Sequence, residues 1–263
     1  MPAEEAKLRV LAVGDVVGKL GRRTLALLLP ELRRQYGLDL VIVNGENAAG
    51  GKGLTAATAQ EILAAGADVI TSGNHIWTHR EIYPLLESDW PILRPLNYPQ
   101  GVPGRGVWAR NGIAVVNLQG RVFMPHTIDC PFRAIDRALE ELAGARVIIV
   151  DMHAEATSEK VALGFYLDGR VSAVVGTHTH VPTADARILP RGTAYVSDLG
   201  MTGGRHSVIG MEIGPVMEHF LTQLPARFVA VEEGPSVLNA VMIEVDEATG
   251  RALSIQRMDR EVE

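Results

Sequence analysis

The stretch VVGTHTHVPT, residues 174–183, places two histidines directly after a run of apolar strand formers. The run ends at Gly176, and His178 and His180 follow with one residue between them. In a strand or an extended turn, residues i and i+2 point to the same side. We therefore expect both imidazoles to leave the end of a buried strand side by side. Two charged imidazoles would repel each other, so a cation that binds both in neutral form explains the pair better.

Outward from this stretch, short apolar runs alternate with helical patterns along the chain. Pro30 marks a kink or a break in the first helical pattern, and Thr55 is placed to cap the second. The alternation favours an α/β architecture in which functional loops follow the C-terminal ends of the strands. It predicts strands at 8–15, 38–47, 68–75 and 145–153, and helices at 21–37, 54–67, 79–88, 131–144 and 160–169.

The remaining segments contain turn and loop signals. Residues 89–106 are rich in Pro and Gly and are expected to form a loop, and 106–120 reads as two strands across an Asn-Gly turn. Residues 186–258 contain strand-like runs, with a hairpin turn at EATG, residues 247–250. Because no internal repeat, low-complexity segment or linker interrupts the chain, we expect a single domain over 1–263.

Composition narrows the class of protein. Hydrophobic residues make up 47% and charged residues 21% of the 263 residues, and no apolar run is long enough to span a bilayer. The acidic N-terminus lacks the layout of a signal peptide, and Cys130 is the only cysteine, so a cytoplasmic protein is expected. The net charge of −6 does not support binding along nucleic acid. A small phosphate ligand is still compatible with that charge, because a metal or a local basic cluster can outweigh it.

Polar side chains gather at five successive strand ends. Most of them follow a glycine, which gives the backbone room to turn. Neighbouring strand ends lie about 5 Å apart, so these groups are expected to converge on one metal centre. Taken singly, each has a simpler explanation as a helix cap, a turn residue or a buried histidine. The residues are Asp15 after the first strand, Glu46 and Asn47 after the second, Asn74 and His75 after the third, His153 after the strand at 145–153, and His178 and His180 after the next.

The order of these motifs resembles the calcineurin-like metallophosphoesterases. The motifs read GDVVG at 14–18, NGENAAGG at 44–51, SGNHIW at 72–77, DMHAEATSEK at 151–160 and GTHTH at 176–180. The resemblance covers about residues 8–205 and is strongest to the bacterial YmdB-type branch, which shares the later GTHTHVPT and GMTG motifs. It implies a β-sandwich flanked by helices, a dinuclear metal centre and phosphodiester hydrolysis.

Two departures from the superfamily pattern shape the expected ligand set. Val17 stands where the first motif usually has a histidine, and Glu46 replaces the usual bridging Asp. We infer that the amide oxygen of Asn47 replaces the missing imidazole, which makes the site richer in oxygen and favours iron or manganese over zinc. The expected ligands are Asp15, Glu46, Asn47 and His180 for metal one, and Glu46, Asn74, His153 and His178 for metal two, with Glu46 as the bridge.

The expected reaction is hydrolysis by a hydroxide shared between the two metals, with His75 protonating the leaving oxygen as the general acid. A supporting role for His75 beside the site is the alternative. The resemblance points to small phosphodiesters, and to 2′,3′-cyclic nucleotides in particular, as substrates. A regulatory module that binds a nucleotide or an RNA end, with a largely structural metal site, is a second function class. A metal-dependent amidohydrolase is a distant third.

Other polar and aromatic residues leave alternatives open. Thr202, Arg205 and His206 lie in a Gly-rich segment and are available to a phosphate, although no P-loop signature is present. Trp77 and Tyr98 can stack on a base or pack in the core. The substrate, the native metals and any homo-oligomer are not determined by the sequence.

Overall fold

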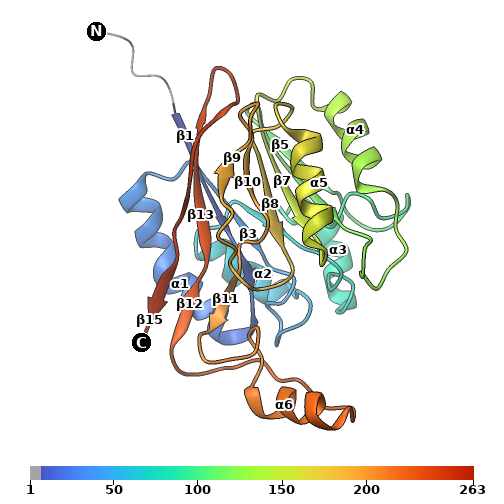
Figure 1. Ribbon diagram of the computed structural model, residues 1–263, viewed down its shortest axis with the longest axis vertical. Helices are drawn as coiled ribbons and strands as arrows, with labels where there is room; N and C mark the ends of the chain where they lie inside the picture. The colour runs from blue at the N-terminus through green and yellow to red at the C-terminus, as the bar shows by residue number, and fades with distance from the viewer. Residues whose placement is uncertain (1–6) are drawn as a thin grey trace.

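Two β-sheets packed face to face form the centre of the molecule (Figure 1). The computed structural model describes residues 7–263. Residues 1–6, on which the expectation of no signal peptide partly rests, lie outside the described residues. Among the described helices, none combines the length and apolar character needed to cross a bilayer.

The first sheet has the order β14-β13-β1-β3-β4, and β1, β3 and β4 run parallel. The second has the order β5-β6-β7-β8-β10-β9, and its four central strands run parallel. The strands of the first sheet are β1 (Lys7–Val13), β3 (Leu40–Asn44), β4 (Val69–Thr71), β13 (Ala240–Asp246) and β14 (Ala252–Arg257). Those of the second are β5 (Val107–Arg110), β6 (Ile113–Gln119), β7 (Val147–His153), β8 (Ala173–Thr177), β9 (Arg187–Ile188) and β10 (Ala194–Val196).

A smaller four-stranded sheet lies at the ends of the large ones. It has the order β15-β12-β11-β2 and contains β2 (Asp15–Val16), β11 (Met201–Gly204), β12 (Ser236–Leu238) and β15 (Arg260–Val262). In this sheet β2 pairs with β11, so the segment directly after β1 is tied to the C-terminal part of the chain.

The alternation of side chains along each strand creates three core layers. In β1, Val10 and Ala12 face the second sheet, whereas Leu11 and Val13 face the helices α1 (Gly18–Tyr36) and α2 (Ala56–Ala64). The outer face of the second sheet packs in the same way against α4 (Pro131–Glu141) and α5 (Thr157–Leu167). The predicted β-sandwich flanked by helices is therefore confirmed.

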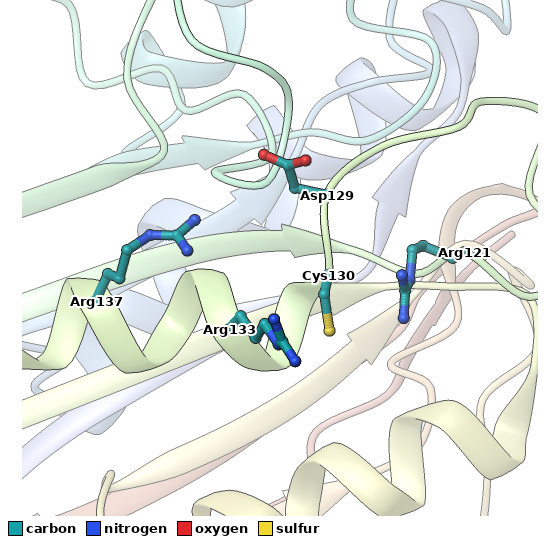
Figure 2. A pocket seen from close by; sticks show the side chains of 5 residues that line it. All are labelled: Arg121, Asp129, Cys130, Arg133 and Arg137. Carbon is teal, nitrogen blue, oxygen red and sulfur yellow. The ribbon is translucent and has the colours of Figure 1, made fainter.

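Several turns and helix ends form where the sequence predicts them. Thr55 caps α2 and forms a capping box with Thr58. Asn111 and Gly112 connect β5 to β6 with φ of 52° and 79°, as a type I′ turn requires. The segment 79–88 forms the short 3-10 helix η1 (Arg80–Ile82) and α3 (Tyr83–Leu86). After β6, a loop leads through Cys130 into α4 (Figure 2).

Two features differ from the expectation. Helix α1 is not broken at Pro30, because Pro30 and Ala26, whose carbonyl loses its helical donor, both lie on the exposed face. The C-terminal part, where strand-like runs were predicted, also contains the helix α6 (Ile213–Thr222). Only Val216 of this helix is buried, and α6 projects from the lower end of the molecule in Figure 1.

Candidate metal centre

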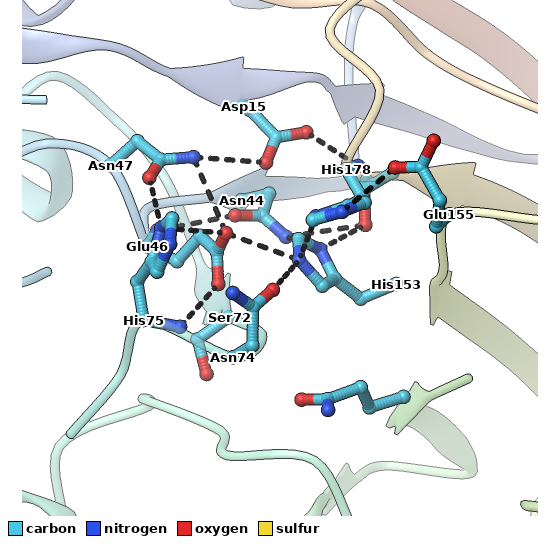
Figure 3. Close-up of polar contacts among 12 residues, drawn as sticks. Asp15, Asn44, Glu46, Asn47, Ser72, Asn74, His75, His153, Glu155 and His178 are labelled. Atoms are coloured by element: carbon cyan, nitrogen blue, oxygen red, sulfur yellow. Dashed lines mark hydrogen bonds and ion pairs between the residues drawn. The ribbon is translucent and has the colours of Figure 1, made fainter. Parts of the chain in front are cut away.

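The predicted site residues meet at the C-terminal ends of the parallel strands of both large sheets (Figure 3). The two sheets supply different kinds of donor group. Residues that follow strands of the first sheet supply carboxylate and amide groups, and residues at the ends of strands of the second sheet supply imidazoles. The first set is Asp15, Glu46, Asn47 and Asn74, and the second is His153, His178 and His180.

One group of donors surrounds His153, which is fully buried. Its Nε2 lies 3.1 Å from Glu46 Oε1, 3.1 Å from Asn74 Oδ1 and 3.0 Å from His178 Nδ1. Donor atoms of Glu46, His153 and His178 all lie within 4.8 Å of one another. Buried nitrogen and oxygen donors that converge in this way have the arrangement a divalent metal requires.

A second group lies beside the first. His180 Nε2 is 3.6 Å from Asp15 Oδ1 and 3.1 Å from the Asn47 amide nitrogen, which is itself 3.3 Å from Glu46 Oε1. Glu46 therefore touches both groups, as a bridging carboxylate must. The donor chemistry of Glu46, His153 and His178 fits a metal ion, whereas the second ion and the assignment of each ligand stay predictions.

Asn47 is turned away from the orientation that its predicted role requires. Its Nδ2 faces Asp15 and His180, whereas its Oδ1 lies 2.7 Å from His75 Nδ1. Coordination through the oxygen would require the amide to rotate by half a turn about its last side-chain bond. After that rotation, Nδ2 would face His75 and the oxygen would point at the second group of donors.

Burial and the charges of neighbouring side chains shift the pKa values of both groups. Burial raises the pKa of Asp15, but the hydrogen bond and the charge of His180 outweigh it and hold that pKa below its usual value. Burial lowers the pKa of His180, and the partnership with Asp15 reverses this and raises it to about 9. Burial and the charge of His153 lower the pKa of His178 to about 3. His178 is thus neutral at pH 7, whereas His180 must release its proton to bind a metal.

Both histidines of the opening motif have unusual backbone conformations. The φ angles are 102° for His178 and 65° for His180, in the left-handed region that favours glycine. Since β8 ends at Thr177, both histidines lie in the turn after the strand: the His178 ring contacts His153, and the His180 ring contacts Asp15. Such backbone strain clusters at functional sites.

A backbone carbonyl determines which ring nitrogen of His180 carries the proton when the ring is neutral. His180 Nδ1 donates a hydrogen bond to the carbonyl of Ile209 at 2.8 Å, so Nε2 is the nitrogen directed at Asp15 and Asn47. A metal-binding imidazole is commonly oriented by a backbone carbonyl in this way.

A buried network behind His153 was not anticipated. His153 Nδ1 lies 2.9 Å from Thr177 Oγ1, which donates to Asp151 at 2.7 Å, and Thr71 donates to the other Asp151 oxygen. Burial raises the pKa of Asp151 to about 6, against the hydrogen bonds from both threonines. The network fixes the position of the His153 ring, so these residues position a candidate ligand without touching the site itself.

The loop that carries both histidines is held by a buried ion pair. Lys160 Nζ lies 2.7 Å from Asp198 Oδ2, and both side chains are almost fully buried. The same Asp198 accepts hydrogen bonds from the backbone N–H groups of Thr179 and Gly200. The motif DMHAEATSEK ends at Lys160, but nothing in the sequence identified its distant partner.

His75 lies at the edge of the second group. Its backbone N–H donates to Glu46 Oε2 at 3.1 Å, and its side chain is 28% exposed. Burial lowers the pKa of His75 below its usual value, although the charge of Glu46 opposes this shift. The position beside the donors, open on one side, is compatible with the predicted general acid.

Several other residues now have defined surroundings. Val17 packs with Met201 and Ala230 in a small apolar cluster, which explains a valine where the superfamily has a ligand. Thr202 is fully buried, and Arg205 pairs with Glu261 at 2.8 Å. Of the three residues considered for phosphate binding, His206 therefore remains exposed and unpaired within the described part of the chain.

Comparison with known proteins agrees with these features. The family described as YmdB-like protein matches residues 11–258. The chain is 48% identical over 256 residues to a Bacillus subtilis (strain 168) protein named 2′,3′-cyclic-nucleotide 2′-phosphodiesterase, covering 95% of this chain and 96% of that protein. The crystal structure of a hypothetical protein from Thermus thermophilus is similar with a TM-score of 0.91 and 49% identity, over 97% of this chain and 100% of that one.

A more distant structure shares only the fold. The NAD nucleotidase of Haemophilus influenzae has a TM-score of 0.56 at 16% identity, covering 97% of this chain and 55% of that one. The family match and the close relatives confirm the resemblance that the strand-end motifs indicated. The chain belongs to the family of YmdB-like proteins.

Proposed function

We propose that this chain is a metal-dependent phosphodiesterase that hydrolyses small phosphodiesters, with 2′,3′-cyclic nucleotides as the preferred class. The observation that carries the proposal is the placement of Glu46, whose carboxylate touches two neighbouring groups of buried donors. The Bacillus subtilis relative, which is named for this activity and is 48% identical over 95% of the chain, supports the substrate class.

Two metal ions fit the donors, one held by Asp15, Glu46, Asn47 and His180 and the other by Glu46, Asn74, His153 and His178. The number of oxygen donors favours iron or manganese. When bound, such a metal pair activates water for attack on phosphorus and neutralises charge on the phosphoryl oxygens.

The chain itself supplies orientation and proton transfer. Asp151 and Thr177 hold the His153 ring, and Lys160 with Asp198 holds the loop of His178 and His180. His75 donates a proton to the ribose oxygen that leaves. Because the pKa of His75 is lowered in the free protein, the phosphodiester anion must raise it again before His75 can act as an acid.

The test combines metal analysis with a panel of substrates. Protein saturated with Mn²⁺ or Fe²⁺ is expected to hold two ions per chain and to hydrolyse 2′,3′-cyclic AMP faster than a phosphomonoester. Glu46→Gln should lose metal and activity together, whereas Glu87→Gln, at an exposed position on the surface, should keep both. Two bound ions without turnover of any phosphodiester would contradict the proposal and leave a nucleotide- or RNA-end-binding module.

A further inference from the structure

A basic pocket lies at the start of α4, outside the metal centre (Figure 2). It has a volume of about 510 Å³ and is lined by Arg121, Arg133, Arg137, Asp129 and Cys130. The lining carries three guanidinium groups and one carboxylate, so the pocket is positive although the chain carries a net charge of −6. We call these five residues the arginine pocket.

The arginines of this pocket differ from about half of the other arginines between residues 7 and 263, whose guanidinium groups are held by protein partners. Arg22, Arg33 and Arg257, for example, donate to carboxylates or carbonyls. The guanidinium groups of the arginine pocket make neither an ion pair nor a hydrogen bond with any residue between 7 and 263. All three side chains belong to exposed residues, so they are free to bind an anion.

One residue of the arginine pocket, Arg121, follows β6 at the same edge of the second sheet that carries the metal centre. In the parallel pairing of β6 and β7, Gln119 lies opposite His153, and Gly120 N–H donates to the His153 carbonyl at 2.9 Å. Consecutive Cα atoms are about 3.8 Å apart and neighbouring strands about 4.8 Å apart, so the Cα of Arg121 lies within about 12 Å of the Cα of His153.

A series of neighbouring aromatic rings links the segment after His75 to the loop before α4. Trp77, two residues after His75, makes an edge contact with Tyr98 at 5.3 Å between ring centroids. Tyr98 in turn lies 6.3 Å from the ring of His126, in the loop that leads to the arginine pocket. The Tyr98 hydroxyl donates to Gln119 at 3.3 Å, which ties the ring to the end of β6. Tyr98 and His126 are partly or fully exposed.

We infer that the arginine pocket and these rings bind the chain of a short oligoribonucleotide whose 3′ end carries a 2′,3′-cyclic phosphate. Guanidinium groups recognise the backbone phosphates, and Tyr98 and His126 offer ring faces on which bases stack. The inference rests on the proposed function and names its substrate class: RNA ends in addition to mononucleotides.

The chemistry restricts the ligand to RNA, because a 2′,3′-cyclic phosphate can form only where the ribose carries a 2′-hydroxyl. Hydrolysis adds one water: its hydroxyl joins phosphorus, one ring P–O bond breaks, and the proton goes to the released ribose oxygen. The product is a phosphomonoester at the 3′ end of an otherwise unchanged chain. A local positive pocket on an acidic protein suits a short single-stranded end better than a long duplex.

The first test compares two substrates and two charge-reversal variants. Arg133→Glu/Arg137→Glu alters the arginine pocket. Arg34→Glu/Arg110→Glu is the matched control, with the same charge change at two exposed arginines that lie near the opposite ends of the strands. For an oligoribonucleotide with a 2′,3′-cyclic phosphate, kcat/KM of the first variant should fall by about tenfold. The slope of log(kcat/KM) against log(salt concentration) should become less steep by about 0.7 for each lost phosphate contact. For 2′,3′-cyclic AMP, the wild type and both variants should have the same kcat/KM.

The second test does not depend on turnover. Cys130 is the only cysteine of the chain and lines the arginine pocket, so a maleimide reports on this place alone. An oligoribonucleotide with a 3′-phosphate should slow the alkylation of Cys130 in the wild type and in the control variant, but not in Arg133→Glu/Arg137→Glu.

The two tests separate the failure of this inference from the failure of the proposed function. A protein that hydrolyses 2′,3′-cyclic AMP but shows neither protection of Cys130 nor arginine-dependent kinetics on the oligoribonucleotide would overturn the inference alone. Protection that depends on Arg133 and Arg137, without hydrolysis of any cyclic phosphate, would support the RNA-binding surface and overturn the proposed activity.

Discussion

Gly73 is the position at which one added methyl group should damage the metal centre most directly. A Cβ atom built at Gly73 would lie 2.1 Å from Cδ2 and 2.2 Å from Nε2 of His153, whereas real Cβ contacts are essentially never shorter than 3.0 Å. The ring would have to retreat by about 0.9 Å to restore that limit. It is held from the other side by Thr177, so the retreat would break the hydrogen bond at Nδ1.

Gly73→Ala should therefore cost more in activity than in stability. Overpacking of this kind costs about 1–3 kcal/mol in the free energy of unfolding. A ligand displaced by about 1 Å should lower turnover by on the order of a hundredfold and metal affinity by about 10- to 100-fold.

The assay measures metal affinity by titration into the metal-free protein, turnover of 2′,3′-cyclic AMP at saturating metal, and urea unfolding. Gly144→Ala is the matched control, because a Cβ at Gly144 meets no atom within 4 Å. A Gly73→Ala protein with wild-type metal affinity and turnover would refute the reasoning, since it would mean that the position of the His153 ring does not matter to the site.

Three further substitutions test other parts of the site. Lys160→Met should lower the free energy of unfolding by about 3–5 kcal/mol, because it leaves Asp198 buried without its cation. In urea unfolding, Lys160→Met/Asp198→Asn should recover part of this loss, and no recovery would contradict the account. His75→Ala should keep both metals but slow hydrolysis of 2′,3′-cyclic nucleotides by about a hundredfold or more, and a p-nitrophenyl phosphodiester much less; equal losses on both would argue against a general acid. Asn47→Ala should lower metal content at one position and reduce turnover. Asn47→Asp, which offers an oxygen in either orientation, should retain the metal. Unchanged metal content and turnover in Asn47→Ala would mean that Asn47 is only a turn residue.

The sequence was sufficient to predict which residues meet at the site, for a simple geometric reason. Parallel strands end at a common edge, so polar residues that follow each apolar run must lie near one another. Asp15, Glu46, Asn74 and His153 could be placed together without knowing any loop in detail. The helices α2 and α4 were equally accessible, because a cap or an amphipathic pattern marks them locally.

The parts that were not predicted depend on pairs that are distant in the sequence. Asp151 was visible at a strand end, but its contacts with Thr71 and Thr177 come from two other strands. The Lys160–Asp198 pair joins residues 38 positions apart. Asp198 of that pair also accepts a hydrogen bond from the backbone N–H of Thr179, between His178 and His180, and no local pattern marks this contact. Helix α6 is different, because its apolar residues follow helical spacing and so carry a local signal for a helix.

The division of donors between the two sheets has a consequence for the time at which the site can form during synthesis. The chain is made from its N-terminus, so the carboxylates and amides up to Asn74 appear first, and the imidazoles up to His180 follow much later. At that stage β1, which leads to Asp15, still lacks its neighbour β13. This strand, Ala240–Asp246, is synthesised later. A nascent chain halted before that strand holds every donor but not the frame that aligns them. We therefore expect metal to enter after the chain has left the ribosome, and prematurely terminated products to be inactive.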